Sequence, residues 1–137
     1  MAVTQYFYNG GLNCAESTLR CLIEDGVIDA PIDTVRMMTG FGGGMQRGNT
    51  CGAVIGAVAA LGWVTGRTDP DASRTESAAA VREFLKRFEA EFRTLSCKEL
   101  QSTYVKEHAL KSDGMYRKCT VFVEKAIEIT KEILSEQ

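Results

Sequence analysis

Apolar residues recur at alternating steps of three and four along two long stretches of this chain. The first stretch contains Ala78, Val81, Leu85, Phe88, Phe92 and Leu95. The second contains Met115, Cys119, Phe122, Ala126, Ile129 and Ile133. Residues at this spacing share one face of an α-helix, so both stretches are predicted to be amphipathic helices.

Three shorter stretches are also predicted to be helical, and they cover residues 14–24, 32–38 and 50–65. The last follows a glycine-rich loop and is made almost entirely of apolar or small residues, which is expected of a central, buried helix. Residues 101–113 show no clear period, and Pro31 and Pro70 mark joints between helices. No stretch alternates as a strand would, so the predicted fold is all-α, a single-domain helical bundle of about five helices.

Composition narrows the classes of protein to which the chain can belong. Its 137 residues, 45% of them apolar, are enough for one core, so residues 1–137 are predicted to form one domain. A net charge of -2 with scattered basic residues argues against nucleic acid as a partner. There is no run of about 18 apolar residues, so the chain is not expected to span a membrane. The first residues lack the pattern of a secretory signal, which predicts a cytoplasmic location.

The chain has five cysteines but only one histidine, His108. A reducing cytoplasm keeps thiols free, so a framework of structural disulfides is not expected. One histidine cannot supply a Ser/His/Asp relay or a multi-histidine metal site, and no Cys-x-x-Cys motif is present. A cysteine taken alone is most often a small core residue. A chemical role therefore requires cysteines to converge from distant positions.

Three cysteines directly follow a residue of the kind that caps a helix. These pairs are Asn13-Cys14, Thr50-Cys51 and Ser96-Cys97. Glutamate lies three positions after Asn13 and after Ser96, which is the spacing of a capping box. The free amides and positive dipole at a helix N-terminus favour a thiolate over a thiol. We therefore expect lowered pKa values for these three thiols.

The other two cysteines have different positions. Cys119 falls on the core-facing stripe of the last helix, beside Arg117 and Lys118, so it is expected to point inward either as a core residue or as part of a site. Cys21 lies seven residues after Cys14, which places it about 10 Å further along the same helix, too far for a disulfide between the two. Cys21 is interpreted as a packing residue.

The glycine-rich loop, residues 40–50, leads directly into the apolar helix. It resembles a phosphate-binding P-loop, but Asn49 stands where the lysine is required. The dinucleotide fingerprint also fails, because Met45 occupies the place of its third glycine. Nucleotide binding is therefore disfavoured. Gly52 and Gly56 lie four apart on one helix face, so the loop and these glycines are predicted to allow another backbone to approach closely.

These pieces resemble a family that is written C_GCAxxG_C_C after its cysteine pattern. The matching pieces are Asn13-Cys14-Ala15-Glu16, the loop from Gly40 to Met45, the core from Cys51 to Ala57, Cys97 and Cys119. The resemblance spans nearly the whole chain and implies an all-helical domain with a redox role. Members are often encoded beside transporters, which implies a redox partner protein associated with transport. Cys21 lies outside the four shared cysteines.

Two functions are considered for a site formed by Cys14, Cys51, Cys97 and Cys119. The first is thiol-disulfide redox chemistry, as an oxidoreductase or electron carrier, with Cys51 as the attacking thiolate, Cys14 as its resolving partner, and the other two as a second pair or relay. The second is metal binding, because four thiolates are the usual ligands of structural zinc and of iron–sulfur clusters. A helical interaction domain with buried cysteines is the third alternative, and self-association into a homo-oligomer stays open.

Overall fold

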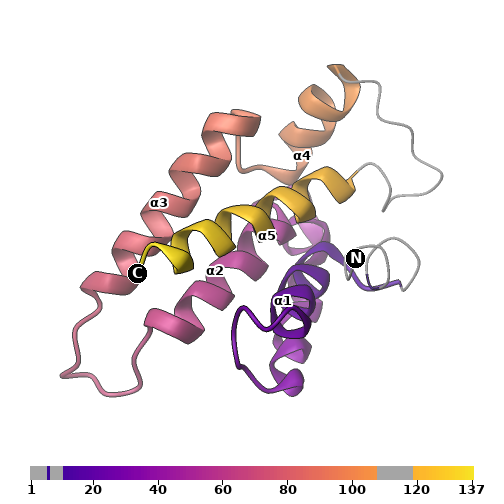
Figure 1. The fold of residues 1–137 in the computed structure, drawn as a ribbon. Coiled ribbons are helices and arrows are strands. Elements are labelled where there is room, and N and C mark those ends of the chain that lie inside the picture. Colours follow the sequence, from indigo (N-terminus) through magenta and orange to yellow (C-terminus); the bar gives the residue numbers. More distant parts are fainter. Residues whose placement is uncertain (1–5, 7–10, 108–118) are drawn as a thin grey trace.

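The computed structural model describes residues 6, 11–107 and 119–137. Among them, the five α-helices are α1 (Cys14–Glu24), α2 (Gly52–Thr65), α3 (Thr75–Phe92), α4 (Cys97–Leu100) and α5 (Thr120–Ser135), shown in Figure 1. Further helical segments are the 3-10 helix η2 (Ile32–Phe41) and the shorter η3 (Gly44–Gly48) and η4 (Gln101–Val105). Across the described ranges there is no β-strand, so the predicted all-α fold is confirmed.

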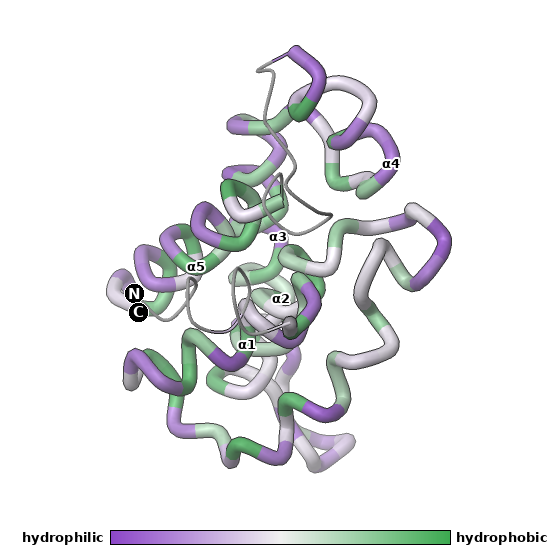
Figure 2. The backbone as a smooth tube through the Cα atoms, turned by 90° about the vertical axis from the view of Figure 1, so that its right-hand side faces the viewer, coloured by the Kyte–Doolittle hydropathy of each residue, from purple (hydrophilic) through white to green (hydrophobic). Residues whose placement is uncertain are grey.

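The helix α2 is central, as its apolar sequence predicts. It contacts α1, α3, α5 and η2. Its most deeply buried side chains are at most 1% exposed, and they belong to Ala53, Val54, Ala57, Ala60 and Leu61. The helix α5 buries the apolar face that was predicted for it. In α3 the predicted face is shifted, because Ala80 and Phe84 are buried with Phe88 and Phe92, whereas Ala78, Val81 and Leu85 are only partly buried. Hydrophobic and hydrophilic residues alternate along both helices in Figure 2. These four neighbouring elements therefore enclose α2.

Two glycines bring α1 unusually close to α2. A β-carbon at Gly56 would lie 2.6 Å from the carbonyl oxygen of Ala15 and 2.9 Å from the β-carbon of Thr18. A β-carbon at Gly52 would lie 3.1 Å from the β-carbon of Cys14. The close backbone approach predicted from this glycine pair is confirmed, and the approaching element is the first turn of α1. Cys14 is thereby placed against the start of α2.

A cluster of aromatic rings packs the end of α3 against η4 and the start of α5. Phe92 near the end of α3 packs edge-on against Tyr104 of η4 and Phe122 of α5, with ring centroids 4.9 Å apart in both pairs. Phe88 packs on Phe92 from within α3, with centroids 4.8 Å apart. Contacts of this kind stabilise by about 0.5–1.5 kcal/mol each beyond burial. The cluster ties the first turn of α5 to the segment that follows Cys97.

Several predicted helix boundaries are corrected. The helix predicted over residues 32–38 is a 3-10 helix that continues to Phe41, and the helix predicted from Thr50 begins at Gly52. The first long periodic stretch ends as a helix at Phe92, because Arg93 adopts a left-handed conformation (φ 71°) that stops it. Leu95 still packs against the core, although it lies beyond the helix.

The stretch predicted to lack helical period is partly helical. Residues 97–107 continue from α4 through η4, and Leu100 and Val105 bury their side chains there. The unusual winding of η4 shifts the buried positions away from the ordinary 3.6-residue spacing, which is why the pattern was not visible. His108, Met115, Arg117 and Lys118 lie outside the described residues.

Candidate functional site

Four of the five cysteines lie at the starts of helices. Cys14 and Cys97 are the first residues of α1 and α4, and Cys51 and Cys119 directly precede α2 and α5. Cys119 was expected within the last helix, but that helix begins one residue later, at Thr120. Cys119 is 7% exposed, so it does point inward as expected.

The capping residues hold two of these starts in place. Asn13 forms the predicted box with Glu16, through reciprocal bonds of 2.9 Å, and its side-chain amide also donates to the carbonyl oxygen of Thr39 in η2. Ser96 accepts from the amide of Glu99 at 3.3 Å, but the Glu99 carboxylate binds the Thr94 hydroxyl, so this box is only half formed.

Thr50 is not the cap that the sequence suggested. Cys51 itself occupies the cap position of α2, and its side chain makes no capping hydrogen bond. Thr50 instead forms an isolated antiparallel bridge with Ser96. In this bridge the amide of Cys51 donates to the Leu95 carbonyl at 2.7 Å, and the amide of Cys97 donates to the Asn49 carbonyl at 2.6 Å. The backbone therefore couples the segment before α2 to the segment before α4.

The four cysteines surround a common space. A small cavity of about 10 Å³ is lined by all four, together with Gly43, Gly52, Leu100, Gln101 and Phe122. A larger cavity of about 300 Å³ is lined by Cys14, Cys97 and Cys119, together with Asn13, Gly42, Gly43, Gln46 and Gln101. No described residue that lines the larger cavity carries a charge. We call this larger, uncharged cavity the chamber. Cys14, Cys97 and Cys119 line the chamber, whereas Cys51 does not.

The fifth cysteine stands apart. Cys21 has no exposed surface and packs in the core of the molecule. It lines neither of the two cavities that the other cysteines share. Its burial, with a smaller contribution from Asp25, raises the pKa of the Cys21 thiol from 9.0 to about 12. These observations agree with its interpretation as a packing residue.

The glycine-rich loop covers the site with a left-handed turn, which we define as residues 43–46. Gly43, Gly44, Met45 and Gln46 have φ values of 61°, 65°, 59° and 62°. A β-carbon at Gly44 would lie 2.7 Å from the β-carbon of Cys97, so only glycine fits there. Met45 and Gln46 are not glycines, and each costs about 1–2 kcal/mol in this conformation. The turn is therefore held by its surroundings rather than by its own preference.

Contact between thiols and burial raise the pKa values of Cys14 and Cys51. A hydrogen bond between the Cys14 and Cys119 thiols is the main cause that raises the pKa of Cys14 well above its ordinary value, followed by burial. Burial raises the pKa of Cys51 from 9.0 to about 12, although the amides of Ala53 and Val54 act in the opposite direction. The lowered pKa values expected at helix N-termini are therefore not found for Cys14 and Cys51.

Cys97, like Cys14, is more accessible than the buried Cys51 and Cys119. Its side chain is only partly buried, and it lines both cavities. The side-chain amide of Gln101 donates a hydrogen bond to its sulfur at 3.6 Å. A charged sulfur accepts such a bond more strongly than a neutral one does. Sequence alone did not single out Gln101, because residues 101–113 show no helical period, although Gln101 lies one ordinary helical turn after Cys97.

A comparison with protein-family models matches residues 12–133 to the family described as "Putative redox-active protein (C_GCAxxG_C_C)". The chain belongs to this family. The match covers all four clustered cysteines and both glycine-containing segments that surround them. No curated protein and no solved structure matched the chain.

The C_GCAxxG_C_C site holds its cysteines as thiols. None of the five cysteines is joined to another in a disulfide. Within the part of the chain that the structure describes, no three His, Cys, Asp or Glu side chains are close enough together to hold a metal ion. In the same part, no helix is both long enough and apolar enough to cross a bilayer.

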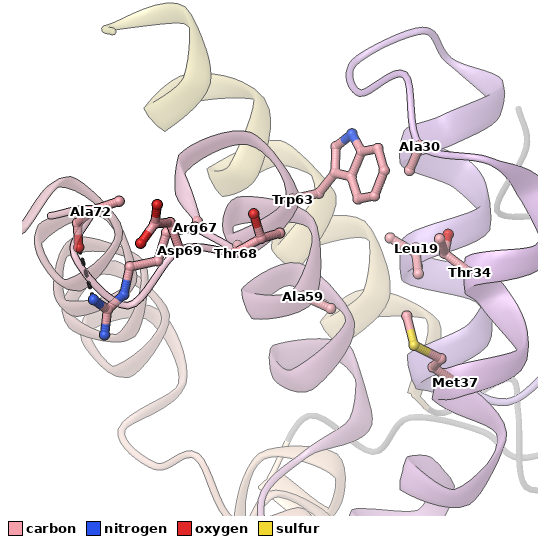
Figure 3. A pocket seen from close by; sticks show the side chains of 12 residues that line it. Leu19, Ala30, Thr34, Met37, Ala59, Trp63, Arg67, Thr68, Asp69 and Ala72 are labelled. Carbon is pink, nitrogen blue, oxygen red and sulfur yellow. Dashed lines mark hydrogen bonds between the residues drawn. The ribbon is translucent and has the colours of Figure 1, made fainter. Parts of the chain in front are cut away.

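A feature that the sequence did not reveal lies near the C-terminal end of α2 (Figure 3). There a pocket of about 680 Å³ is lined by Trp63 from α2 and by Met37 from η2, among other residues. Trp63 belongs to the helix that was predicted to be buried, but it is 48% exposed and donates from its indole nitrogen to Asp29 at 2.9 Å. None of the described residues that line this pocket is a cysteine, so it takes no part in the thiol site.

Proposed function

We propose that this member of the C_GCAxxG_C_C family is a thiol-disulfide redox protein in which Cys14 and Cys119 form the reversible disulfide. The observation that carries the proposal is that both thiols line the small cavity, and contact with Cys119 is the first cause of the raised pKa of Cys14. Both also line the larger cavity, so a reagent that enters it meets the pair directly. They lie at the starts of α1 and α5, so the fold brings together two thiols that are far apart in the sequence.

The chemical step balances without any further cofactor. The thiolate of Cys14, the more exposed of the two, attacks one sulfur of a small disulfide RS–SR and expels RS⁻. The Cys119 sulfur then attacks the Cys14 sulfur, the intramolecular disulfide forms, and a second RS⁻ leaves. The two protons of the cysteines pass to the two RS⁻ groups, so two thiols are oxidised and one disulfide is reduced. In the reverse direction the protein supplies the disulfide.

The chamber also restricts the substrate. Its walls are carboxamides, glycine backbone and thiols, with no charged side chain among the described lining residues. A charged reagent would lose its hydration there without gaining a counter-charge, which is costly. A small, uncharged disulfide or thiol therefore fits the chamber best. This assignment also moves the attacking role away from Cys51, which the sequence favoured, because Cys51 is only 3% exposed and does not line the chamber.

The test is oxidation of the reduced protein by excess bis(2-hydroxyethyl) disulfide, followed by proteolysis and mass mapping. We expect a crosslinked peptide pair that contains Cys14 and Cys119 and returns to free thiols with dithiothreitol. The variants Cys14→Ser and Cys119→Ser lose this crosslink, whereas the matched control Cys21→Ala keeps it. A folded wild-type protein that gives no such crosslink would falsify the proposal, with the fold checked by circular dichroism.

Metal binding is the second candidate function, and one observation favours it. The cavity that all four cysteines line has a volume of about 10 Å³, close to the space that one water molecule or one ion occupies. Zinc or an iron–sulfur cluster at this point requires the sulfurs to draw closer together than they now lie, because no three ligands converge among the described residues. Elemental analysis of protein purified under anaerobic conditions decides the question. Stoichiometric zinc or iron would replace the redox proposal.

A further inference from the structure

Two clustered cysteines, Cys51 and Cys97, take no part in the Cys14–Cys119 disulfide. Their backbones are coupled directly, because each donates its amide hydrogen bond into the segment that carries the other, to Leu95 and Asn49 respectively. These two bonds flank the Thr50–Ser96 bridge. The coupling places Cys51 and Cys97 one position beyond the bridge on each side.

The register of the bridge determines where the two side chains point. Successive side chains of an extended segment alternate between its two faces. Thr50 and Ser96 share one face, so Cys51 and Cys97 share the other. The small cavity agrees with this, since both cysteines line it. Among the cysteines that raise the pKa of Cys51, Cys97 also contributes most. Geometry and electrostatics therefore give the same pairing.

We propose that Cys51 and Cys97 form a second dithiol, so that the centre stores four electrons in two disulfides rather than two electrons in one. This inference rests on the proposed redox function and extends it to the remaining half of the site. The substrate class is the same, a small uncharged disulfide, because Cys97 faces the same chamber as Cys14 and Cys119.

The two thiols of this second pair have unequal access and therefore unequal roles. Cys97 is partly exposed and accepts a hydrogen bond from Gln101, so its thiolate attacks RS–SR and expels one RS⁻. Cys51 is buried and cannot meet the reagent, so it attacks the Cys97 sulfur and expels the second RS⁻. Both cysteine protons pass to the RS⁻ groups. Cys97 is the entry thiol and Cys51 is the resolving thiol.

Closing this bond draws the two segments together. Diagonal neighbours across an antiparallel pair are separated by about 7–8 Å, whereas the Cα atoms of a disulfide are usually at most about 6.8 Å apart. The two segments must therefore move towards each other, and the movement falls on the bridge that joins them.

Counting thiols gives the first test. With excess bis(2-hydroxyethyl) disulfide, we expect the wild-type protein to lose four of its five thiols and to yield two crosslinks, Cys14–Cys119 and Cys51–Cys97. Cys51→Ser and Cys97→Ser each lose only the second crosslink. The Cys51→Ser variant is expected to fold, because serine is a favoured helix cap and would stand at the cap position of α2.

Unequal access gives the second test. In Cys51→Ser, the mixed disulfide on Cys97 has no resolving thiol and accumulates as one mercaptoethanol adduct, which intact mass detects. In Cys97→Ser, the buried Cys51 acquires at least tenfold less adduct over the same time. A purely structural role for the pair predicts no such asymmetry. Equal amounts of mercaptoethanol adduct on the two variants would contradict the assignment of roles.

The outcomes separate this inference from the proposed function. A protein that forms Cys14–Cys119 but keeps Cys51 and Cys97 as thiols retains the proposed function and overturns the second dithiol. A protein that forms neither crosslink overturns both. Crossed linkages, such as Cys14–Cys51, overturn both pairings, although redox activity itself would stand.

Discussion

At the scale of single residues, the environment of the Cys51 sulfur combines two opposing effects. The first amides of α2 favour a thiolate, and burial favours the neutral thiol. A helix N-terminus contributes about 0.3–1 kcal/mol at an exposed site, whereas burial can move a pKa by several units. Burial therefore prevails, and the pKa of Cys51 rises to about 12. Capping motifs in the sequence reveal the first effect but not the second.

Access also predicts the order in which the thiols react. We expect Cys97 to be alkylated first by iodoacetamide near neutral pH, because it is partly exposed and accepts the Gln101 hydrogen bond. Cys21, with no exposed surface, is expected to react only on unfolding. Timed quenching and peptide mass analysis give the rate at each cysteine.

The matched variant Gln101→Leu isolates the role of that hydrogen bond. It should slow alkylation of Cys97 by about three- to tenfold, since one bond to a charged group contributes about 1.5–3 kcal/mol at most and water replaces part of it. The rate at Cys14 should stay unchanged. If Cys51 reacts before Cys97 in the folded protein, the assigned order of access is wrong.

At the scale of elements, the contact between α1 and α2 depends on which glycine faces the partner helix. Gly56 faces the backbone of Ala15, whereas no atom lies within 4 Å of a β-carbon built at Gly62 of the same helix. The same substitution at these two positions should therefore have opposite effects on the free energy of unfolding.

Gly56→Ala is expected to lower the free energy of unfolding by about 1–3 kcal/mol, because a carbonyl oxygen 2.6 Å away cannot move aside without moving α1. Gly62→Ala is expected to raise it by up to about 1 kcal/mol, because alanine has the higher helix propensity. Urea denaturation followed by circular dichroism measures both. Equal losses in the two variants would contradict the close contact.

Elements with ordinary periodicity could be predicted from the sequence, and elements with unusual backbone could not. The apolar run of α2 and the stripes of α3 and α5 identified three helices within a few residues. The left-handed turn was hidden, because Met45 and Gln46 rarely adopt positive φ on their own. The Thr50–Ser96 bridge, which couples the segments that carry Cys51 and Cys97, depends on tertiary contact alone. The four cysteines that line the small cavity could therefore be named in advance, but their relative burial could not.

At the scale of the whole molecule, buried thiols couple stability to alkaline pH. The pKa values of Cys21 and Cys51 are raised from 9.0 to about 12 in the folded protein. Between pH 9 and pH 12 the unfolded chain loses these protons while the folded protein keeps them. The folded state then binds more protons, so stability must fall as pH rises through this range.

The expected loss is about 1.4 kcal/mol per pH unit for each of these thiols. Urea unfolding at a series of pH values above 9 measures it. In Cys21→Ala one titrating thiol is absent, so its stability should fall less steeply than that of the wild type by about that amount. Lysine and tyrosine titrate in both proteins and cancel in the difference. Parallel curves for the two proteins would show that Cys21 does not contribute.

The position of Cys119 has a consequence for biosynthesis. Cys14 is made early and Cys119 late, with most of the chain between them, and domains are completed as they leave the ribosome from the N-terminal side. While the chain is being made, α1 can form its capping box before Cys119 has been added. The Cys14–Cys119 pair that we propose can therefore be assembled only when α5 arrives. Until then Cys14 belongs to a chain that lacks its proposed partner.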